Sequence, residues 1–297
     1  ANTTGSNNVG VGASALTACT TGTRNVAMGF GALQGLTTGI RNLALGQHAS
    51  ASGNGSYNVA VGEQSLYNSA ADGTTAVGYK ALLTNTTGGY NVPVSYYSLL
   101  TNTTGEMNTS VGYEALHDNT TGSYCVALGT KALSNNTTAL YNIGIGVHAL
   151  LTNTTGTRNV AMGHAALEDS TTADDNVAIG YGALRDNTTG THNTAVGSSA
   201  LVAATTGAYN TACGRKALTA VTTGDNNAAC GRDAGFAITT GDKNTCMGRS
   251  AGNTTTTGEN NSTLGFNAQP SSAGADNEVT LGDANISSLR CADTSIS

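Results

Sequence analysis

A short alternation of larger apolar and small residues recurs along the whole chain. In the stretch N-V-A-M-G-H-A-A-L (Asn159–Leu167), Val160 and Met162 flank a small residue, and Gly163 follows directly. Such period-two alternation predicts a β-strand, and the glycine predicts a corner after it. A leucine stands four residues beyond the glycine, and a Thr-Gly turn leads to the next strand. One unit therefore predicts a strand, a corner, a short second segment and a turn.

The unit returns with an almost constant spacing. Glycine fills the corner in 16 copies and Ser95 fills it in one, and the step is 17 residues apart from two steps of 16. Seventeen residues are too few for a strand plus a full helix or for a propeller blade, and they suit one coil of a parallel β-solenoid. We therefore predict an all-β protein, a parallel β-solenoid of about 17 coils that stack at ~4.8 Å into a rod of roughly 80 Å.

The last part of the sequence departs from this pattern. The segment Gln269–Ser272 interrupts the regular columns after Gly265. We therefore divide the chain into a solenoid shaft, residues 1–265, and a terminal region, residues 266–297, that holds the last coil, a cap and a linker.

Two polar patterns predict how neighbouring coils are joined. Asparagine stands four residues before the corner in every coil except those with Thr74, Cys125 or Glu278. Superposed asparagine side chains form hydrogen-bonded ladders along a stack. The tetrapeptide NTTG occurs six times and has the composition of a turn. We interpret it as the turn that starts the next coil rather than as a glycan acceptor.

The position two residues before the corner is alanine in ten coils. If the larger apolar residues on either side of it face the core, the alternation of a strand directs this column outward. An outward column that stays small predicts a closely packed cover, most simply a second copy of the rod. We therefore predict a homo-oligomer, with a trimer as its expected form. The predicted interface residues are Ala27, Ala44, Ala60, Ala76, Ala127, Ala161, Ala178, Ala195, Ala212 and Ala229.

Composition and charge narrow the function classes. Only 5% of the residues are aromatic and tryptophan is absent, so the expected core is thin and repetitive. The net charge of −6 and the scattered lysines and arginines argue against nucleic-acid binding. No apolar stretch approaches the ~20 residues that cross a bilayer, so we predict no membrane insertion.

The residue types that carry catalysis or bind metals are dispersed. The five histidines occupy differing positions of the repeat, the six cysteines form no CxxC motif, and the glycine-rich segments lack a phosphate-loop signature. We interpret the cysteines as small buried apolar residues. We therefore predict a protein that is not an enzyme, with no catalytic residue, no metal and no cofactor.

The most variable column lies five residues before the corner, and tyrosine and arginine are frequent in it. Variation beside rigid columns predicts an exposed position. Aromatic rings pack on sugars and arginine donates forked hydrogen bonds, so this column is a candidate for contact with a cell-surface glycan or protein. A merely tolerant surface is the alternative. The irregular repeat around Pro93 adds two further tyrosines. The candidate contact residues are Tyr57, Tyr90, Tyr124, Tyr141, Arg158, Tyr209, Tyr96 and Tyr97.

These repeats resemble those of known fibrous proteins. N-V-A-M-G-H-A-A-L (Asn159–Leu167) and N-V-A-I-G-Y-G-A-L (Asn176–Leu184) are similar to the head repeats of trimeric autotransporter adhesins. The longer form with the NTTG linker is similar to repeats of bacteriophage tail fibres. The likeness covers about residues 2–282, although the repeat of 17 residues is longer than that of the adhesin heads. It implies a left-handed parallel β-roll packed as a homotrimer.

The segment Asn277–Ser297 resembles the one that precedes an endosialidase-type intramolecular chaperone in many tail fibres. The resemblance implies that such a chaperone trimerises the fibre and then cuts itself off at a Ser-Asp site beyond Ser297. The mature chain would then carry no peptidase residues.

We expect a structural fibre of a virus particle, located on the virion and outside the cell, that attaches to the host surface through multivalent contacts. A bacterial trimeric surface adhesin is the first alternative, and it would need a membrane anchor beyond Ser297. An ice-binding solenoid is the second alternative, suggested by the paired threonines, although adjacent threonines point to opposite sides of a strand.

Overall fold

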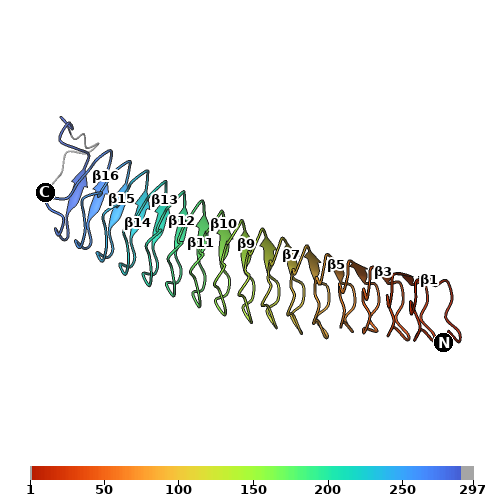
Figure 1. Ribbon diagram of the computed structural model, residues 1–297. Coiled ribbons are helices and arrows are strands. Elements are labelled where there is room, and N and C mark those ends of the chain that lie inside the picture. Colours follow the sequence, from red (N-terminus) through yellow and green to blue (C-terminus); the bar gives the residue numbers. More distant parts are fainter. Residues whose placement is uncertain (1, 289–297) are drawn as a thin grey trace, which may run out of the picture.

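The computed structural model describes residues 2–288. It is an all-β, parallel β-solenoid in which 17 short strands stack along one axis, and no helix occurs among the described residues. The coils follow one another without a break, so the first and last coils lie at opposite ends of a long rod (Figure 1). The predicted fold class is therefore confirmed, whereas the left-handed sense and the trimeric packing stay predictions.

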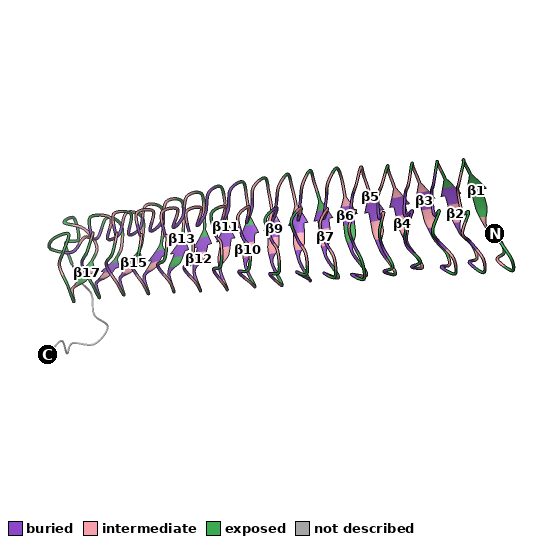
Figure 2. Cartoon of the chain, turned by 60° about the horizontal axis from the view of Figure 1, so that its bottom comes forward, coloured by how far each residue is buried: buried purple, intermediate pink, exposed green. Residues whose placement is uncertain are grey.

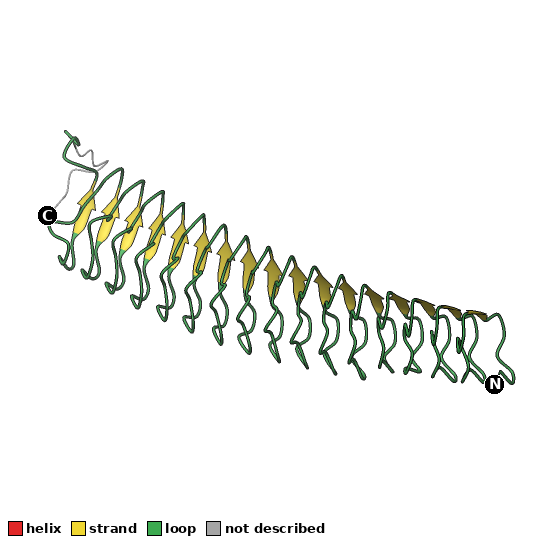
Figure 3. Cartoon of the chain, in the orientation of Figure 1, coloured by secondary structure: helices red, strands yellow, loops and turns green. Residues whose placement is uncertain are grey.

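Each strand has three residues and lies directly before a corner. Turns and loops make up the rest of every coil (Figure 3). We number the coils 1 to 17 by the strand that each contains. The strands are β1 (Val9–Val11), β2 (Val26–Met28), β3 (Leu43–Leu45), β4 (Val59–Val61), β5 (Thr75–Val77), β6 (Val92–Val94), β7 (Thr109–Val111), β8 (Val126–Leu128), β9 (Ile143–Ile145), β10 (Val160–Met162), β11 (Val177–Ile179), β12 (Thr194–Val196), β13 (Thr211–Cys213), β14 (Ala228–Cys230), β15 (Thr245–Met247), β16 (Ser262–Leu264) and β17 (Val279–Leu281).

Every strand pairs in parallel with the strand of the next coil, and the register follows the repeat. Ala161 of β10 lies beside Ala178 of β11, and the other strand pairs match in the same way. Between β5 and β6 the pairing is reduced to Val77 and Val94, because Pro93 has no N–H to donate. A column in the sequence is thus a line of neighbouring side chains along the rod.

The corner glycine is required by its backbone conformation and by the closeness of the next coil. Gly163 has a φ of 138°, and a Cβ added there would lie 2.5 Å from the carbonyl oxygen of Gly180. A side chain at this corner therefore meets both an unfavourable backbone and a steric clash. Ser95, the one exception, has a φ of 123°, so coil 6 carries backbone strain that a glycine would avoid.

The alanine column lies inside the solenoid, and its predicted place in an oligomer interface is wrong. These alanines are at most 2% exposed within the single chain and belong to one apolar core with the leucine column. The strand residues on either side of them face outward instead, which leaves the strand centres more buried than their ends (Figure 2). The corrected residues are Ala27, Ala44, Ala60, Ala76, Ala127, Ala161, Ala178, Ala195, Ala212 and Ala229.

The interior is too narrow for a larger side chain in the alanine column. Gly144 stands in this column, and an added Cβ would lie 3.2 Å from both Leu133 Cγ and the Ala149 carbonyl oxygen. A methyl group therefore fills the space that the opposite wall leaves. The column is small because of packing within the chain, and a covering partner is not needed to explain it.

The leucine column forms the opposite wall of this core. Leu167 is fully buried and has a φ of 52°, and the same left-handed conformation recurs in the other leucines of the column. A left-handed backbone costs roughly 1–2 kcal/mol for such a residue, while burying a leucine side chain contributes about 1.5–3 kcal/mol. Burial therefore outweighs the strained backbone at these corners.

Two hydrogen-bonded ladders run along the rod. In the predicted asparagine column, Asn159 Oδ1 accepts the backbone N–H of Asn176 at 3.0 Å, which confirms the first ladder. The asparagines of NTTG form a second one: Asn119 Nδ2 donates to Asn102 Oδ1 at 2.8 Å and to the Gly122 carbonyl at 2.9 Å. The NTTG turn is therefore tied to its neighbours through a buried side chain.

The described part of the terminal region continues the solenoid. β17 pairs with β16 in register, so that Thr280 lies beside Thr263. The predicted linker to a chaperone falls on residues 289–297, which lie outside the described residues.

Candidate binding surfaces

The sheet presents an apolar outer face along the whole rod. We define the outer face as the first and last residue of each strand, and none of the 17 strands carries a lysine, arginine, aspartate or glutamate there. Many of its large apolar side chains are exposed, which is unusual for a surface that meets only water. The exposed ones are Val9, Val11, Met28, Val92, Val111, Met162, Ile179, Val196, Met247, Leu264, Val279 and Leu281.

The variable column forms an exposed line in which successive side chains contact each other. Tyr124 and Tyr141 stack with their ring centroids 5.1 Å apart and an interplanar angle of 14°. The guanidinium of Arg41 lies 5.3 Å from the centroid of the Tyr57 ring. Because these groups cover one another's faces, a ligand reaches mainly ring edges and hydroxyl groups.

Two other candidates in this column also bind their neighbours. Arg158 donates from Nε and Nη2 to the two carboxylate oxygens of Asp175, at 2.6 and 2.8 Å. This hydrogen-bonded pair holds the pKa of the Asp175 carboxyl below its usual value. Tyr209 stacks on His192 with ring centroids 4.8 Å apart. A ligand for Arg158 would therefore compete with Asp175.

Tyr90 is the most exposed of the candidate tyrosines, with 60% of its surface accessible. The coil before it has Gly73 in the same column, and an added Cβ there would lie 2.8 Å from Cδ1 of the Tyr90 ring. The ring thus rests on a glycine, whereas Tyr141 rests on another ring. Tyr90 offers more free aromatic surface than its relatives in the column.

Four tyrosines gather around the irregular coil 6 and form an aromatic cluster. Tyr96 stacks with Tyr79 at 5.0 Å and with Tyr113 at 5.8 Å between centroids, and it contacts Tyr97 at 4.1 Å. A hydrogen bond with Tyr97 raises the pKa of Tyr96 to about 12. The structure therefore brings the two candidate tyrosines together. Sequence reasoning missed Tyr79 and Tyr113, although tyrosine directly follows the corner position in three consecutive coils.

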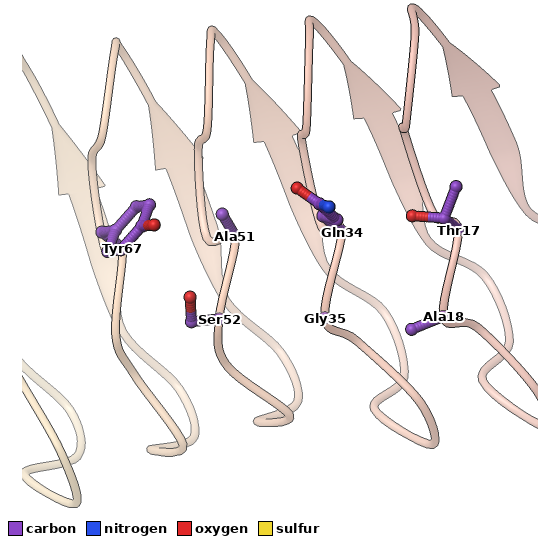
Figure 4. Close-up of a pocket in the computed structure, with 7 residues that line it drawn as sticks. All are labelled: Thr17, Ala18, Gln34, Gly35, Ala51, Ser52 and Tyr67. Atoms are coloured by element: carbon purple, nitrogen blue, oxygen red, sulfur yellow. The ribbon is translucent and has the colours of Figure 1, made fainter.

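A shallow hollow of about 640 Å³ lies on coils 1 to 4 (Figure 4). Two rows of side chains line it: Thr17, Gln34, Ala51 and Tyr67 in one row, and Ala18, Gly35 and Ser52 in the other. The hollow exists because the second row carries little side chain. Its lining holds no charged group and one aromatic ring, so it offers hydrogen bonds and a single stacking surface.

The cysteines fall into two groups. The buried ones are Cys19, Cys125 and Cys246. Burial raises the pKa of the Cys125 thiol to about 11. Cys213 and Cys230 are exposed and lie side by side, in register, on the outer face. The interpretation as buried apolar residues is confirmed for the first group and wrong for the second, and Cys291 lies outside the described residues.

The described residues hold no ready-made metal site. Between residues 2 and 288, no three side chains of histidine, cysteine, aspartate or glutamate gather as metal ligands would. This part of the chain also has no helix with the length and apolar character needed to cross a membrane. No protein-family model matches the sequence, and no curated protein matches it. The function is therefore argued from the surfaces alone.

Proposed function

We propose that the protein is the shaft of a virus fibre, a bacteriophage tail fibre, that extends from the particle and attaches it to the host cell surface. The observation that carries this proposal is the continuous stack of 17 strands, which reaches roughly 80 Å at ~4.8 Å per coil. Hydrogen bonds and buried asparagine ladders cross each boundary between coils. Such a rod keeps its length and direction, as an attachment fibre requires.

The exposed column and the aromatic cluster are the proposed host contacts. Tyr90 and Tyr96 present aromatic surface to solvent, and further tyrosines repeat along the rod. Each contact with a sugar or a protein is weak, but identical chains in a homotrimer present each contact three times. Avidity then multiplies the strength of attachment.

The proposal is tested on the virus that carries the gene. Antibodies against the chain are expected to label fibres on the virion in electron micrographs and to reduce adsorption to host cells. The purified chain should compete with the virus for adsorption, and the double variant Tyr90→Ala with Tyr96→Ala should compete at least ~10-fold less well. Tyr67→Ala serves as the matched control, because Tyr67 lies in the hollow and outside both contact surfaces. Unlabelled virions, or adsorption that saturating protein leaves unchanged, would contradict the proposal.

A bacterial trimeric surface adhesin is the alternative that uses the same rod. It differs in location, since the antibodies would then label the bacterial envelope and no virion. The contact surfaces would serve the same purpose there, so the competition experiment alone does not separate the two.

The ice-binding alternative has less support. In the turn, Thr154 Oγ1 donates to the carbonyl oxygen of Thr171 at 3.1 Å, and the equivalent hydroxyls of other coils do the same. Only the second threonine, such as Thr155, is exposed, which gives a single column on a turn rather than a flat face. Thermal hysteresis in a solution of the purified protein would favour this alternative.

A further inference from the structure

The outer face of the sheet has a rim at each end of its strands, and in the C-terminal coils the two rims carry opposite charge. The basic rim follows β13, β14 and β15, and the acidic rim precedes β14 to β17 by three residues. The basic rim is Arg215, Lys216, Arg232 and Arg249, and the acidic rim is Asp225, Asp242, Glu259 and Asp276. The basic rim holds four of the 12 lysines and arginines of an acidic chain, so composition does not explain it.

The charges of the basic rim are only partly satisfied within the chain. Arg232 pairs with Asp233, with 2.9 Å between Nε and Oδ2. Arg249 lies 5.3 Å from the ring centroid of Phe266, which leaves its charge without a carboxylate. Arg215 is exposed and has no ion-pair partner among the described residues. Net positive charge therefore remains at this edge.

The acidic rim likewise keeps its charge. Asp242 Oδ1 accepts the backbone N–H of Asp225 at 2.7 Å, and Asp276 Oδ1 accepts that of Glu259 at 2.8 Å, so each of these carboxylates spends one oxygen on the neighbouring coil. Lys243, which follows Asp242 in the sequence, offsets part of the charge. Carboxylates stacked at ~4.8 Å repel one another, so the rim favours a partner of opposite charge.

The two rims cannot neutralise each other in one chain. Asp225 and Arg232 flank the same strand and are seven residues apart in sequence. Seven extended residues span about 23 Å, several times the reach of an ion pair. Complementary charge must come from outside the chain.

We propose that the outer face binds a second copy of this chain, parallel and in axial register, so that the acidic rim of one copy faces the basic rim of the next. This inference rests on the proposed function only for the statement that the rod is a homo-oligomer. It replaces the alanine column as the interface. Asp225 then faces Arg232 of the neighbouring copy, and Asp242 faces its Arg249.

The arrangement of charge selects the parallel orientation. Rotation about an axis along the rod brings the end of a strand in one copy beside the start of a strand in the next, which matches basic with acidic. A face-to-face antiparallel pair would place each rim against the same rim of its partner, which matches like charges. Cyclic assembly around the rod axis is therefore favoured.

The repeat itself makes a second copy the best partner for this face. An identical rod has the same spacing between coils, so a contact made once recurs at every coil. Five residues of strand and corner are about 16 Å wide, so 17 coils offer roughly 1,300 Å² per chain, above the ~800 Å² per partner of a standard interface. The absence of charge on the outer face fits burial in such a contact.

Charge reversal tests the orientation. The triple variant Arg215→Glu, Arg232→Glu and Arg249→Glu makes both rims acidic, and we expect its assembly to weaken at least ~10-fold in sedimentation velocity. Adding Asp225→Lys, Asp242→Lys and Glu259→Lys restores complementary rims and should restore assembly. Arg185→Glu is the matched control, because Arg185 pairs with Asp186 away from both rims. Circular dichroism and Tm verify that each variant is folded.

The exposed thiols give a second reading of the same contact. In a Cys291→Ser background, maleimide should label Cys213 and Cys230 slowly in the assembled protein and at least ~10-fold faster in the triple variant. If the six-fold variant does not fold, salt decides: the wild-type assembly should weaken with added NaCl and the triple variant should not.

The outcomes separate this inference from the proposed function. Assembly that survives the triple reversal, or folded six-fold variants that stay dissociated, overturns the rim pairing and leaves the fibre proposal standing. A wild-type chain that is monomeric at high concentration overturns both the pairing and the homotrimer. An intact assembly that fails to compete for adsorption overturns host attachment and leaves the pairing standing.

Discussion

The inner and outer faces of the same sheet obey different rules. On the inner face alanine recurs almost without change, because the leucine wall leaves room for little more than a methyl group. On the outer face, one coil to the next replaces Met162 by Ile179, Val196 and Cys213. The inner face is limited by volume and the outer face by polarity alone. A uniform column therefore marks close packing, and it does not say whether that packing is within a chain or between chains.

Enlarging the inner face should have the largest effect. In the variant Ala161→Leu with Ala178→Leu, two neighbouring coils are overpacked at once, at about 1–3 kcal/mol for each site and more if the sites couple. We expect the chain to lose its solubility or its Tm to fall by about 5 °C or more. Thermal unfolding of the dissociated chain measures this. An unchanged Tm would mean that these alanines do not face the core.

Cutting the asparagine ladder should have the next largest effect. Asn159→Ala removes the acceptor of the Asn176 N–H and the donor to the Ala173 carbonyl, which are both buried contacts. Each buried group left without a partner costs about 1–3 kcal/mol, so we expect a loss near 2–4 kcal/mol. Equilibrium denaturation gives the value, and Asn7→Ala at an exposed position is the control. Equal stability of the two variants would rule out a load on the ladder.

Polar substitution on the outer face should separate folding from association. Ile179→Ser is expected to change the stability of the dissociated chain by no more than about 0.5 kcal/mol, since the side chain is partly exposed. The same variant should weaken assembly, because it places a hydroxyl in the proposed apolar contact. Denaturation at low protein concentration and sedimentation at high concentration measure the two quantities. Destabilisation as large as that of the alanine variants would place Ile179 in the core.

Thiol chemistry should distinguish the faces without changing the fold. The thiolate is the reactive form, and the raised pKa of Cys125, about 11, keeps that thiol protonated at neutral pH. Cys213 and Cys230 of the dissociated chain should therefore react with maleimide at neutral pH, while Cys125 reacts only when the chain unfolds. Mass spectrometry of labelled peptides reads each site. Labelling of Cys125 at the rate of Cys213 would contradict its burial.

The smallest effect is expected at the exposed pair of Arg158 and Asp175. Because the pKa of Asp175 is lowered in the folded chain, its contribution is present above the unfolded pKa of about 4 and disappears as pH falls through the folded value. Arg158→Ala should lower Tm slightly at neutral pH and not at all near pH 2. A Tm difference that persists in acid would assign the effect to packing rather than charge.

Periodicity was sufficient to locate every strand, since Val160–Met162 and its equivalents lie where the alternation predicts them. It was not sufficient to decide which residues of a strand face inward. Ala161 and its neighbours satisfy the same alternation in both directions, and the choice depends on the distance to the opposite wall. That distance is set by left-handed corners such as Leu167, a conformation that residue type does not favour.

The candidate contacts were predictable in position and less so in chemistry. Tyr96 and Tyr97 are adjacent in sequence, so their meeting is no surprise. The pairing of Arg158 with Asp175 follows from the spacing of 17 residues, which makes them neighbours in one column. Applied to Tyr124 and Tyr141, the same rule predicts a stack that hides the ring faces from a ligand. Columns must therefore be considered as interacting side chains before they are considered as binding residues.

The hydrogen bonds between coils run along the rod, and this gives the fibre a mechanical property. A force applied to the two ends loads the coils one after another, so they detach singly from an end while the others stay folded. Each detached coil frees 17 residues, which extend to about 55 Å in place of a rise of ~4.8 Å. Under tension the rod would therefore lengthen in equal steps and dissipate work at each one, which lets a tethered particle withstand a sudden pull.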